Sequence, residues 1–291
     1  MLNALTIDVE DYYMVSAFAD VVKFEDWPSF ESRVEMNTLR LLELLARANV
    51  KATFFVLGWV AERHPGLIKE IHGAGHELAS HGYRHQLVYD QSEKEFSANV
   101  RRSKKTIEDI SGEAVTGFRA ASYSITKRSL WALDVLANEG FRYDSSIFPI
   151  YHDRYGYPEF SRFPVNIACN GAHILEIPPS TIKLLGRNIP IAGGGYLRIF
   201  PLQFLEWGIR SLNTNEHQSA VIYLHPWEID PDQPRINGRR LSVIRHNMNT
   251  HKTLPRLNRL LKNFQFAPIR EVFADALASV PISASSPNLQ R

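Results

Sequence analysis

The sequence predicts an α/β fold in which parallel strands are wrapped by helices. Short apolar runs alternate with longer amphipathic segments, and this strand-then-helix alternation occurs four times with short connections. Polar residues follow most of the apolar runs, at positions where a hydrophobic core has no use for them. Functional residues of a parallel α/β barrel lie at the carboxyl ends of its strands, so these positions are where a site is expected.

Hydrophobic periodicity places each element along the chain. Strands are predicted at residues 4–9, 51–58, 76–81, 115–120, 141–146 and 219–226. Helices are predicted at residues 36–50, 60–75, 92–112, 126–140 and most of 240–264. The alternation fails at about 147–200, where Pro, Gly and aromatic residues crowd together, and a loop-rich insertion over the active-site face is expected there. We predict one domain over residues 1–280 and a frayed tail over 281–291.

Length and composition are those of an ordinary soluble globular protein. The chain has 291 residues, of which 44% are hydrophobic and 22% charged. A chain of this length can bury a large core without disulfides or a structural metal. The net charge is +2, so no overall field favours nucleic acid or a membrane surface, and no nucleic-acid partner is expected. The oligomeric state has no signature in the sequence.

Cysteine content and the first residues bear on the compartment. Cys169 is the only cysteine, which excludes an intrachain disulfide and a thiolate metal cluster within the chain. The N-terminus lacks the basic start and apolar run of a signal peptide. No run of 18 uncharged apolar residues is present, so no integral membrane segment is predicted. The expected location is the cytoplasm.

Side chains that can bind a metal ion or transfer a proton follow successive predicted strands. They are Asp8, Glu10 and Asp11 after the first strand, His81 and His85 after the third, Arg119 after the fourth, Asp144 after the fifth, and His225 after the last. Each of them alone is common on a protein surface. Their placement at the same ends of successive strands predicts a shared site.

These residue types together suit amide hydrolysis. Two imidazoles and one carboxylate form a ligand set for Zn²⁺ or a similar divalent ion, with one position left for water. Such an ion lowers the pKa of its water and polarises a carbonyl oxygen. A second carboxylate can accept the proton of the water, an arginine can orient that carboxylate, and a histidine can protonate an amine leaving group.

Five short stretches occur in the order of the motifs of one family. "TIDVEDYY", "SHGYRH", "FRAASYS", "YDSS" and "YLHP" resemble the motifs of the polysaccharide deacetylases of the NodB-homology type, carbohydrate esterase family 4. The resemblance covers roughly residues 4 to 270. The "DVEDYY" start and "HPWEIDPDQPR" look like the branch found with bacterial exopolysaccharide biosynthesis loci. The resemblance implies a distorted (β/α) barrel and a hydrolase that removes N-acetyl groups from a glycan.

The resemblance also implies roles for individual residues. It implies Asp8 as the catalytic base, His81 and His85 as ligands of a divalent metal, Arg119 as the residue that orients the base, the Ser122 N–H as an oxyanion donor, Leu224 in the pocket for the acetyl methyl group, and His225 as the general acid. The metal is expected to be Zn²⁺, with Co²⁺, Ni²⁺ and Mn²⁺ as alternatives. The expected partner is an N-acetylated glycan, and Tyr123 and Trp227 are expected to contact its sugars.

Three departures from the family pattern leave alternatives open. Val9 follows Asp8 where the common motif has a second aspartate, so Glu10 or Asp11 is the carboxylate ligand, and Glu10 is favoured. Ala121 replaces the usual proline of the arginine motif. The tryptophan expected after Asp144 is absent, so Asp144 either tunes an active-site partner or caps its strand.

Other readings of the chain compete with deacetylation of a glycan. The same fold can support an amidohydrolase of a small non-sugar amide or cyclic ureide, or an inert glycan-binding relative. The basic stretch at 241–262, which includes Arg245, could face an anionic glycan, but a solvated helix face is the more common arrangement and is predicted here.

Overall fold

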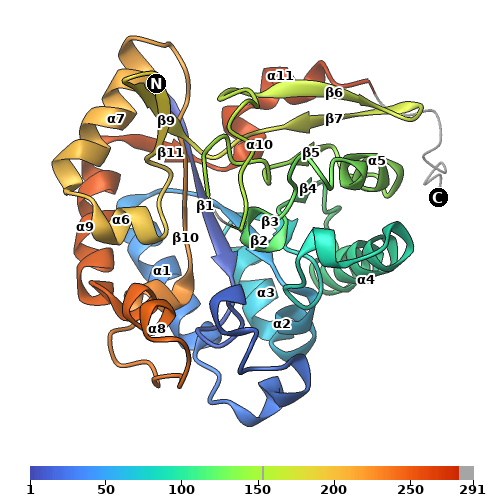
Figure 1. The fold of residues 1–291 in the computed structure, drawn as a ribbon, viewed down its shortest axis with the longest axis vertical. Helices are drawn as coiled ribbons and strands as arrows, with labels where there is room; N and C mark the ends of the chain where they lie inside the picture. Colours follow the sequence, from blue (N-terminus) through green and yellow to red (C-terminus); the bar gives the residue numbers. More distant parts are fainter. Residues whose placement is uncertain (153, 282–291) are drawn as a thin grey trace.

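The computed structural model describes residues 1–152 and 154–281 and confirms the predicted α/β class (Figure 1). One sheet runs through the molecule in the order β10-β1-β2-β3-β4-β5-β7-β6, and β11 pairs with β1. Its strands are β1 Leu2–Val9, β2 Thr53–Val56, β3 Glu77–Ser80, β4 Gly117–Phe118, β5 Tyr143–Asp144, β6 Val165–Cys169, β7 Ala172–Glu176, β10 Val221–Leu224 and β11 Gln265–Ala267. All its pairings are parallel except that of β6 with β7. β10 and β6 stand at the two ends of this order. Within the described residues they do not pair with each other, so the barrel is incomplete.

Helices lie around the outside of the strands in Figure 1. They are α1 Val34–Ala48, α2 Gly58–Arg63, α3 Pro65–Gly73, α4 Glu93–Ser111, α5 Trp131–Asn138, α6 Gly195–Ile199, α7 Leu202–Thr214, α8 Arg240–Asn247, α9 Thr250–Asn263, α10 Ile269–Val272 and α11 Ala274–Ala278. The helix predicted at 60–75 is two helices, because proline has no N–H to donate and is favoured at a helix start, where α3 begins at Pro65. Among the described helices, none is both long and apolar enough to cross a membrane.

The segment predicted as a loop-rich insertion contains two β-hairpins as well as irregular stretches. β6 and β7 form an antiparallel hairpin that joins the main sheet, and β8 Thr181–Leu184 pairs with β9 Arg187–Pro190 in a second hairpin. The first hairpin turns at Asn170 and Gly171, and Gly171 adopts a φ of +80°, which glycine tolerates best. An Asn-Gly pair favours a two-residue hairpin turn, so the sequence itself indicates a hairpin here. The predicted frayed tail falls, from residue 282 onward, outside the described residues.

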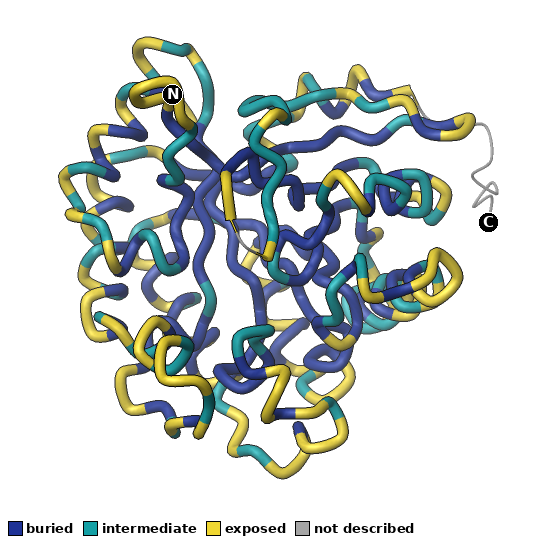
Figure 2. The backbone as a smooth tube through the Cα atoms, viewed as in Figure 1, coloured by how far each residue is buried: buried dark blue, intermediate teal, exposed yellow. Residues whose placement is uncertain are grey.

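The strands form the buried centre of the fold (Figure 2). Register brings their carboxyl ends to one rim, since Val9 pairs with Val56, Val56 with Ser80, and Ser80 with Phe118. β10 lies along the other side of β1. Residues that follow β1, β3, β4 and β10 therefore meet at this rim, although they lie far apart in the sequence.

Candidate active site

Strand geometry places two carboxylates of the first motif on the same side of the chain. Successive side chains of a strand point to opposite faces, so Asp8 and Glu10 share a side and Val9 points the other way. Val9 is fully buried in the hydrophobic core, whereas Asp8 and Glu10 line a pocket. The spacing of two residues therefore lets both carboxylates face the same site.

Glu10, His81 and His85 form a compact cluster of metal-ligating atoms. One potential ligand atom from each side chain lies within 4.8 Å of the other two, and all three residues are buried. Glu10 Oε2 is 2.9 Å from His85 Nε2. Burial raises the pKa of Glu10, but the neighbouring His85 and His225 outweigh burial and hold the pKa below its usual range. Glu10 is therefore a carboxylate, as a metal ligand must be.

The state of His81 also fits a divalent ion. Its Nδ1 lies 2.8 Å from the Arg119 carbonyl oxygen, so Nδ1 carries the proton that this carbonyl accepts and Nε2 is left with its lone pair. Burial lowers the pKa of His81 to about 4, which keeps the imidazole neutral. Two imidazoles and one carboxylate are a donor set that suits Zn²⁺ and related ions.

Asp11, the alternative carboxylate ligand, lies outside this cluster. Its Oδ2 accepts hydrogen bonds from the backbone N–H groups of Arg33 (2.7 Å) and Val34 (3.0 Å) and from the Ser32 hydroxyl (3.1 Å). These donors are at the start of α1, where the first N–H groups of a helix have no partner within it. Asp11 thus caps α1, and the geometry favours Glu10 as the carboxylate of the cluster.

Arg119 binds Asp8 in the interior of the protein. Arg119 Nη1 donates to Asp8 Oδ1 (2.7 Å) and to the Thr6 hydroxyl (2.7 Å), and neither Arg119 nor Asp8 is more than 2% exposed. Its other nitrogens donate to the carbonyl and hydroxyl of Ser145. One oxygen of Asp8 is therefore fixed, and the other, Oδ2, faces His225 Nε2 at 3.8 Å.

His225 is held by a carboxylate that the sequence analysis missed. Its Nδ1 lies 2.9 Å from Glu228 Oε2, and Glu228 Oε1 accepts a hydrogen bond from Arg198 Nε at 2.7 Å. Burial lowers the pKa of His225, but Glu10 and Glu228 outweigh burial and raise the pKa to about 9. His225 is therefore protonated near neutral pH. The spacing in "HPWE" could have indicated this contact from the sequence. Pro226 begins a short 3-10 helix, which brings Glu228, three residues after His225, back to the histidine.

Trp227 contacts three polar side chains of the site. Its ring stacks on His225 (centroids 5.2 Å apart, planes at 19°) and on His246 (4.1 Å, 16°). Its indole N–H donates to Glu10 Oε1 at 3.1 Å. Trp227 is 5% exposed and contacts both Glu10 and His225, which suits a role in positioning them, and its contact with a sugar stays a prediction.

The residues after β4 form a strained turn at the pocket wall. Ser122 and Tyr123 both adopt positive φ values (50° and 53°). Residues other than glycine rarely adopt such values, and those that do are concentrated at functional sites. Both residues line the pocket. The Tyr123 ring packs on Tyr223 (centroids 5.0 Å apart), while Leu224 is fully buried at the end of β10. The Ser122 hydroxyl is 2.8 Å from that of Ser16.

Asp144 lies apart from the pocket and pairs with a second carboxyl group. It is level with Glu176 on the neighbouring strand, and both side chains are fully buried. Burial raises the pKa of Asp144, and burial together with the Asp144 charge raises the pKa of Glu176 well above its usual value. Glu176 Oε1 accepts the N–H groups of Ser146 and Ile147, and the Ser146 hydroxyl donates to Asp144. The pair therefore shares a proton and orders the turn after β5. The carboxylate that contacts His225 is Glu228 and not Asp144.

The shared proton predicts a pH-dependent effect of Glu176→Gln. Glu176 keeps its proton when folded and loses it above about pH 4.5 when unfolded, so the wild type loses about 1.4 kcal/mol of stability for each pH unit above that value, up to the folded-state pKa. Glutamine reproduces the protonated form. We expect the variant to match the wild type at pH 5 and to exceed its stability at pH 8 in urea unfolding. The exposed Glu159→Gln is the control, and parallel pH profiles for Glu176→Gln and the wild type would contradict the shared proton.

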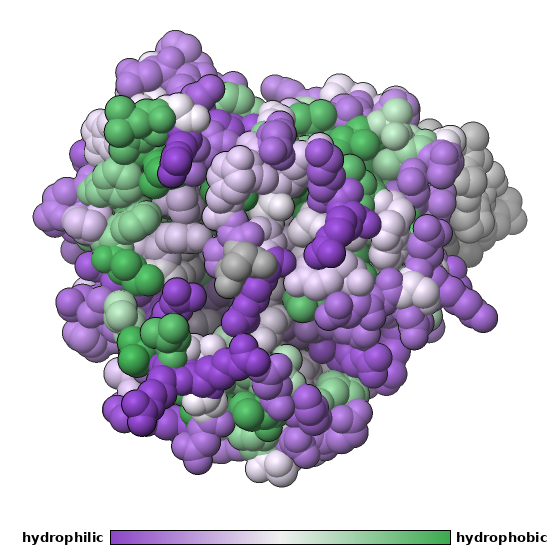
Figure 3. All heavy atoms as spheres, viewed as in Figure 1, coloured by the Kyte–Doolittle hydropathy of each residue, from purple (hydrophilic) through white to green (hydrophobic). Residues whose placement is uncertain are grey.

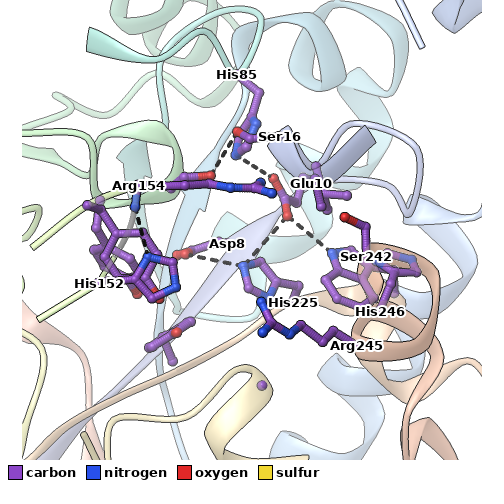
Figure 4. A pocket seen from close by; sticks show the side chains of 18 of the residues that line it. Asp8, Glu10, Ser16, His85, His152, Arg154, His225, Ser242, Arg245 and His246 are labelled. Atoms are coloured by element: carbon purple, nitrogen blue, oxygen red, sulfur yellow. Dashed lines mark hydrogen bonds and ion pairs between the residues drawn. The ribbon is translucent and has the colours of Figure 1, made fainter. Parts of the chain in front are cut away.

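These side chains surround one pocket of about 590 Å³ (Figure 4). Asp8, Glu10 and His225 face one another in its centre, and His152 and Arg154 reach in from the opposite side to Ser242, Arg245 and His246 of α8. Of the predicted residues, the pocket brings together Asp8, Glu10, His81, His85, Ser122, Tyr123, His225 and Trp227. Arg119 lies directly behind Asp8, while Asp11, Asp144 and Leu224 are not in the lining.

Two family profiles match adjacent parts of the chain. The polysaccharide deacetylase profile matches residues 21–143, and the profile described as a domain of unknown function (DUF3473) matches residues 145–274. The site takes His81, His85 and Arg119 from the first part and Arg198, His225 and Glu228 from the second. Asp8 and Glu10 precede both.

Individual proteins show the same relationship. A peptidoglycan-N-acetylglucosamine deacetylase of Bacillus cereus is 31% identical over 112 residues, 38% of this chain and 39% of that protein. The peptidoglycan-N-acetylglucosamine deacetylase PgdA of Listeria monocytogenes is 36% identical over 105 residues, 36% of this chain and 22% of that protein. These matches therefore span less than half of either relative. A Mycobacterium smegmatis crystal structure assigned to the polysaccharide deacetylases has the same fold, with a TM-score of 0.65, 21% identity, and coverage of 99% of this chain and 94% of that one.

Proposed function

We propose that this chain, whose residues 21–143 match the polysaccharide deacetylase profile, hydrolyses the N-acetyl groups of amino sugars in a polysaccharide or its biosynthetic precursor. The observation that carries this proposal is the convergence of a base, an acid and a metal-ligand set. Asp8 Oδ2 and Glu10 Oε1 lie 3.8 and 3.6 Å from His225 Nε2, beside His81 and His85. We further propose that both profile regions act as one domain over residues 1–280, since β5, which begins at the end of the first region, pairs with β7 of the second.

Glu10, His81 and His85 are proposed to hold the metal ion, and Zn²⁺ is the ion that this donor set suits best. A divalent ion bound there supplies a Lewis acid that polarises the amide carbonyl and makes a water molecule more acidic. The Trp227 N–H bond to Glu10 and the Arg119 carbonyl bond to His81 orient two of the ligands.

Asp8 is proposed to act as the general base. Its Oδ1 is held by Arg119, so the free Oδ2 is available to take the proton of the attacking water as that water adds to the acetamide carbon. The buried guanidinium keeps this carboxylate oriented while its charge changes. The Ser122 N–H is proposed to stabilise the oxyanion that develops on the carbonyl oxygen, and Leu224, which is fully buried next to His225, is proposed to lie behind the space for the acetyl methyl group.

His225 is proposed to act as the general acid. Its Nε2 faces the centre of the pocket, and its Nδ1 is bound by Glu228, which stabilises the imidazolium form. The proton on Nε2 passes to the departing sugar amine as the C–N bond breaks, which gives acetate and a free amine. Arg198 fixes Glu228 from behind and so holds the acid in place.

Release of acetate from N-acetylglucosamine oligomers by the metal-loaded protein tests this proposal. We expect acetate and new primary amines in equal amounts, and loss of both after chelation of the metal. Acetate release from no N-acetylated sugar, with ammonia or amine release from small amides or cyclic ureides, would favour the amidohydrolase alternative. Binding of oligomers without turnover would favour an inert relative. The exopolysaccharide assignment is then tested with polymers and precursors of that class.

A further inference from the structure

The charges of the pocket lining do not balance. Asp8 is paired with Arg119, Glu10 is next to His85 and His225, and Arg198 is paired with Glu228. The carboxylates of the pocket thus already have cationic or metal-ligating neighbours. Two cationic side chains of the lining remain, and they are Arg154 and Arg245.

Arg154 and Arg245 stand on opposite walls of the pocket. Both are exposed, and within residues 1–152 and 154–281 no ion pair joins either guanidinium to a carboxylate. Figure 4 shows Arg154 extending from the His152 side and Arg245 from the α8 side, each toward the space in front of Glu10 and His225. Arg245 is exposed, as predicted for a solvated helix face, and it also lines the pocket.

The end of α8 is fixed in this position by Arg198. Arg198 Nη1 donates to the carbonyl oxygens of Arg245 (3.1 Å), His246 (2.8 Å) and Met248 (2.9 Å). The same guanidinium binds Glu228 through Nε. One buried arginine therefore ties the residue that holds the general acid to the helix end that carries Arg245.

His246 adds an unused polar atom to the same wall. Its side chain is 6% exposed and lines the pocket, and its Nε2 is buried without a hydrogen-bond partner in the described part of the chain. Burial, with Arg198 nearby, lowers the pKa of His246 to about 3, so the ring is neutral and can donate a hydrogen bond through an N–H. A buried polar group without a partner is unfavourable, and a bound ligand can supply the partner.

We propose that this pocket selects an N-acetylated glycan that carries an oxyanion, a carboxylate or a phosphate, next to the sugar to be deacetylated. Arg154 and Arg245 bind the anion from two sides, and His246 Nε2–H donates to an oxygen of the same sugar unit or anion. The inference rests on the proposed deacetylase function and names its substrate class. Guanidinium groups bind carboxylates and phosphates through paired N–H donors, and two of them around one pocket favour an acidic substrate over a neutral one.

Matched substrates and charge-matched variants test the proposal. The neutral N-acetylglucosamine tetramer is compared with a hyaluronan tetrasaccharide, which alternates N-acetylglucosamine with glucuronate. N-acetylglucosamine 1-phosphate is compared with the methyl glycoside of N-acetylglucosamine. The variants are Arg154→Gln/Arg245→Gln and, as the control, Arg235→Gln/Arg240→Gln, which removes two exposed arginines outside the pocket lining.

We expect the wild type to deacetylate at least one charged substrate with a kcat/KM about 10- to 100-fold above that of its neutral counterpart. The pocket variant should lose this preference through KM and keep its rate on the neutral substrate within about 2-fold, while the control keeps the preference. The charged compound that shows the preference identifies the anion as carboxylate or phosphate. A wild type that favours the neutral substrates, or equal losses on both classes, would overturn the proposal.

Direct binding separates this inference from the proposed function. The same compounds are titrated into metal-free protein by calorimetry, so that the anion cannot bind to the metal ion. If no acetate is released from any substrate but a charged sugar binds the wild type and the control, and not the pocket variant, the anion site stands and the deacetylase assignment falls. If neither charged sugar binds more tightly than its neutral counterpart, the anion site is overturned.

Discussion

Asp8→Asn is expected to lower kcat for acetate release by about 10²- to 10⁴-fold, the usual contribution of a positioned general base. Asparagine has the shape of aspartate and can still accept the hydrogen bond from Arg119, but it cannot take a proton from water. The metal content should stay at the wild-type level, because Asp8 is not part of the Glu10, His81 and His85 cluster. The measurements are steady-state acetate release and metal analysis of the same preparation.

Asp11→Asn is the matched control for this prediction. It replaces a buried carboxylate of the same motif whose partners are N–H and hydroxyl donors at the start of α1. It should alter stability and leave kcat within about 2-fold, since the side chain does not reach the pocket. A similar loss of kcat in both variants would show that disturbance of the segment, and not removal of a base, causes the effect. Near-wild-type turnover of Asp8→Asn would show that another group is the base.

The double variant His81→Ala/His85→Ala is expected to lose divalent metal binding and acetate release together. Two of three ligands are removed, and loss even of the groups that orient a ligand weakens metal affinity by about 10- to 100-fold, so a larger effect is expected here. The readouts are metal per chain after dialysis against a defined free-zinc buffer, and acetate release with added metal. Removal of the two buried imidazoles also leaves cavities, so circular dichroism must first show that the variant is folded.

His76→Ala is the control for this second prediction. His76 is a buried histidine just before β3, and its Nδ1 accepts a hydrogen bond from the Ala52 N–H at the far end of the strand from His81. It should keep one metal ion per chain. Stoichiometric metal in the double variant would overturn the ligand assignment. Absence of metal from both the wild type and His76→Ala, even after reconstitution, would show that the three side chains form no metal site.

Local pattern was sufficient for most of the fold because each element buries a periodic apolar face. The strand around Ile7 and the helix over Leu41 and Leu45 were visible as runs of period two and period 3.6. The segment at 147–200 was harder, because its hairpin strands have only four or five residues each and no common pattern of burial. There the Asn170-Gly171 turn carried more information than the apolar residues beside it.

The choice between Glu10 and Asp11 needed the tertiary structure. Both are carboxylates within reach of a strand end, so composition does not separate them. The strand alternation favours Glu10, but the deciding fact is that α1 begins beside Asp11 and offers it unpaired N–H groups. The partner of His225 was hidden for a similar reason, since Glu228 becomes its neighbour only when Pro226 starts a tight turn.

The sequence by itself predicted the α/β class, the resemblance to polysaccharide deacetylases and the candidate site residues Asp8, His81, His85, Arg119 and His225, because these depend on patterns within short stretches. Tertiary structure alone decided that Arg198 ties Glu228 to α8, that Trp227 stacks on His246, and that Arg245 lies in the pocket wall. The contacts of Arg198 with Glu228 and His246, and of Trp227 with His246, join residues that are 19 to 48 positions apart, and the place of Arg245 depends on the direction in which α8 packs. Such contacts are set by the packing of the whole chain, which no local periodicity encodes.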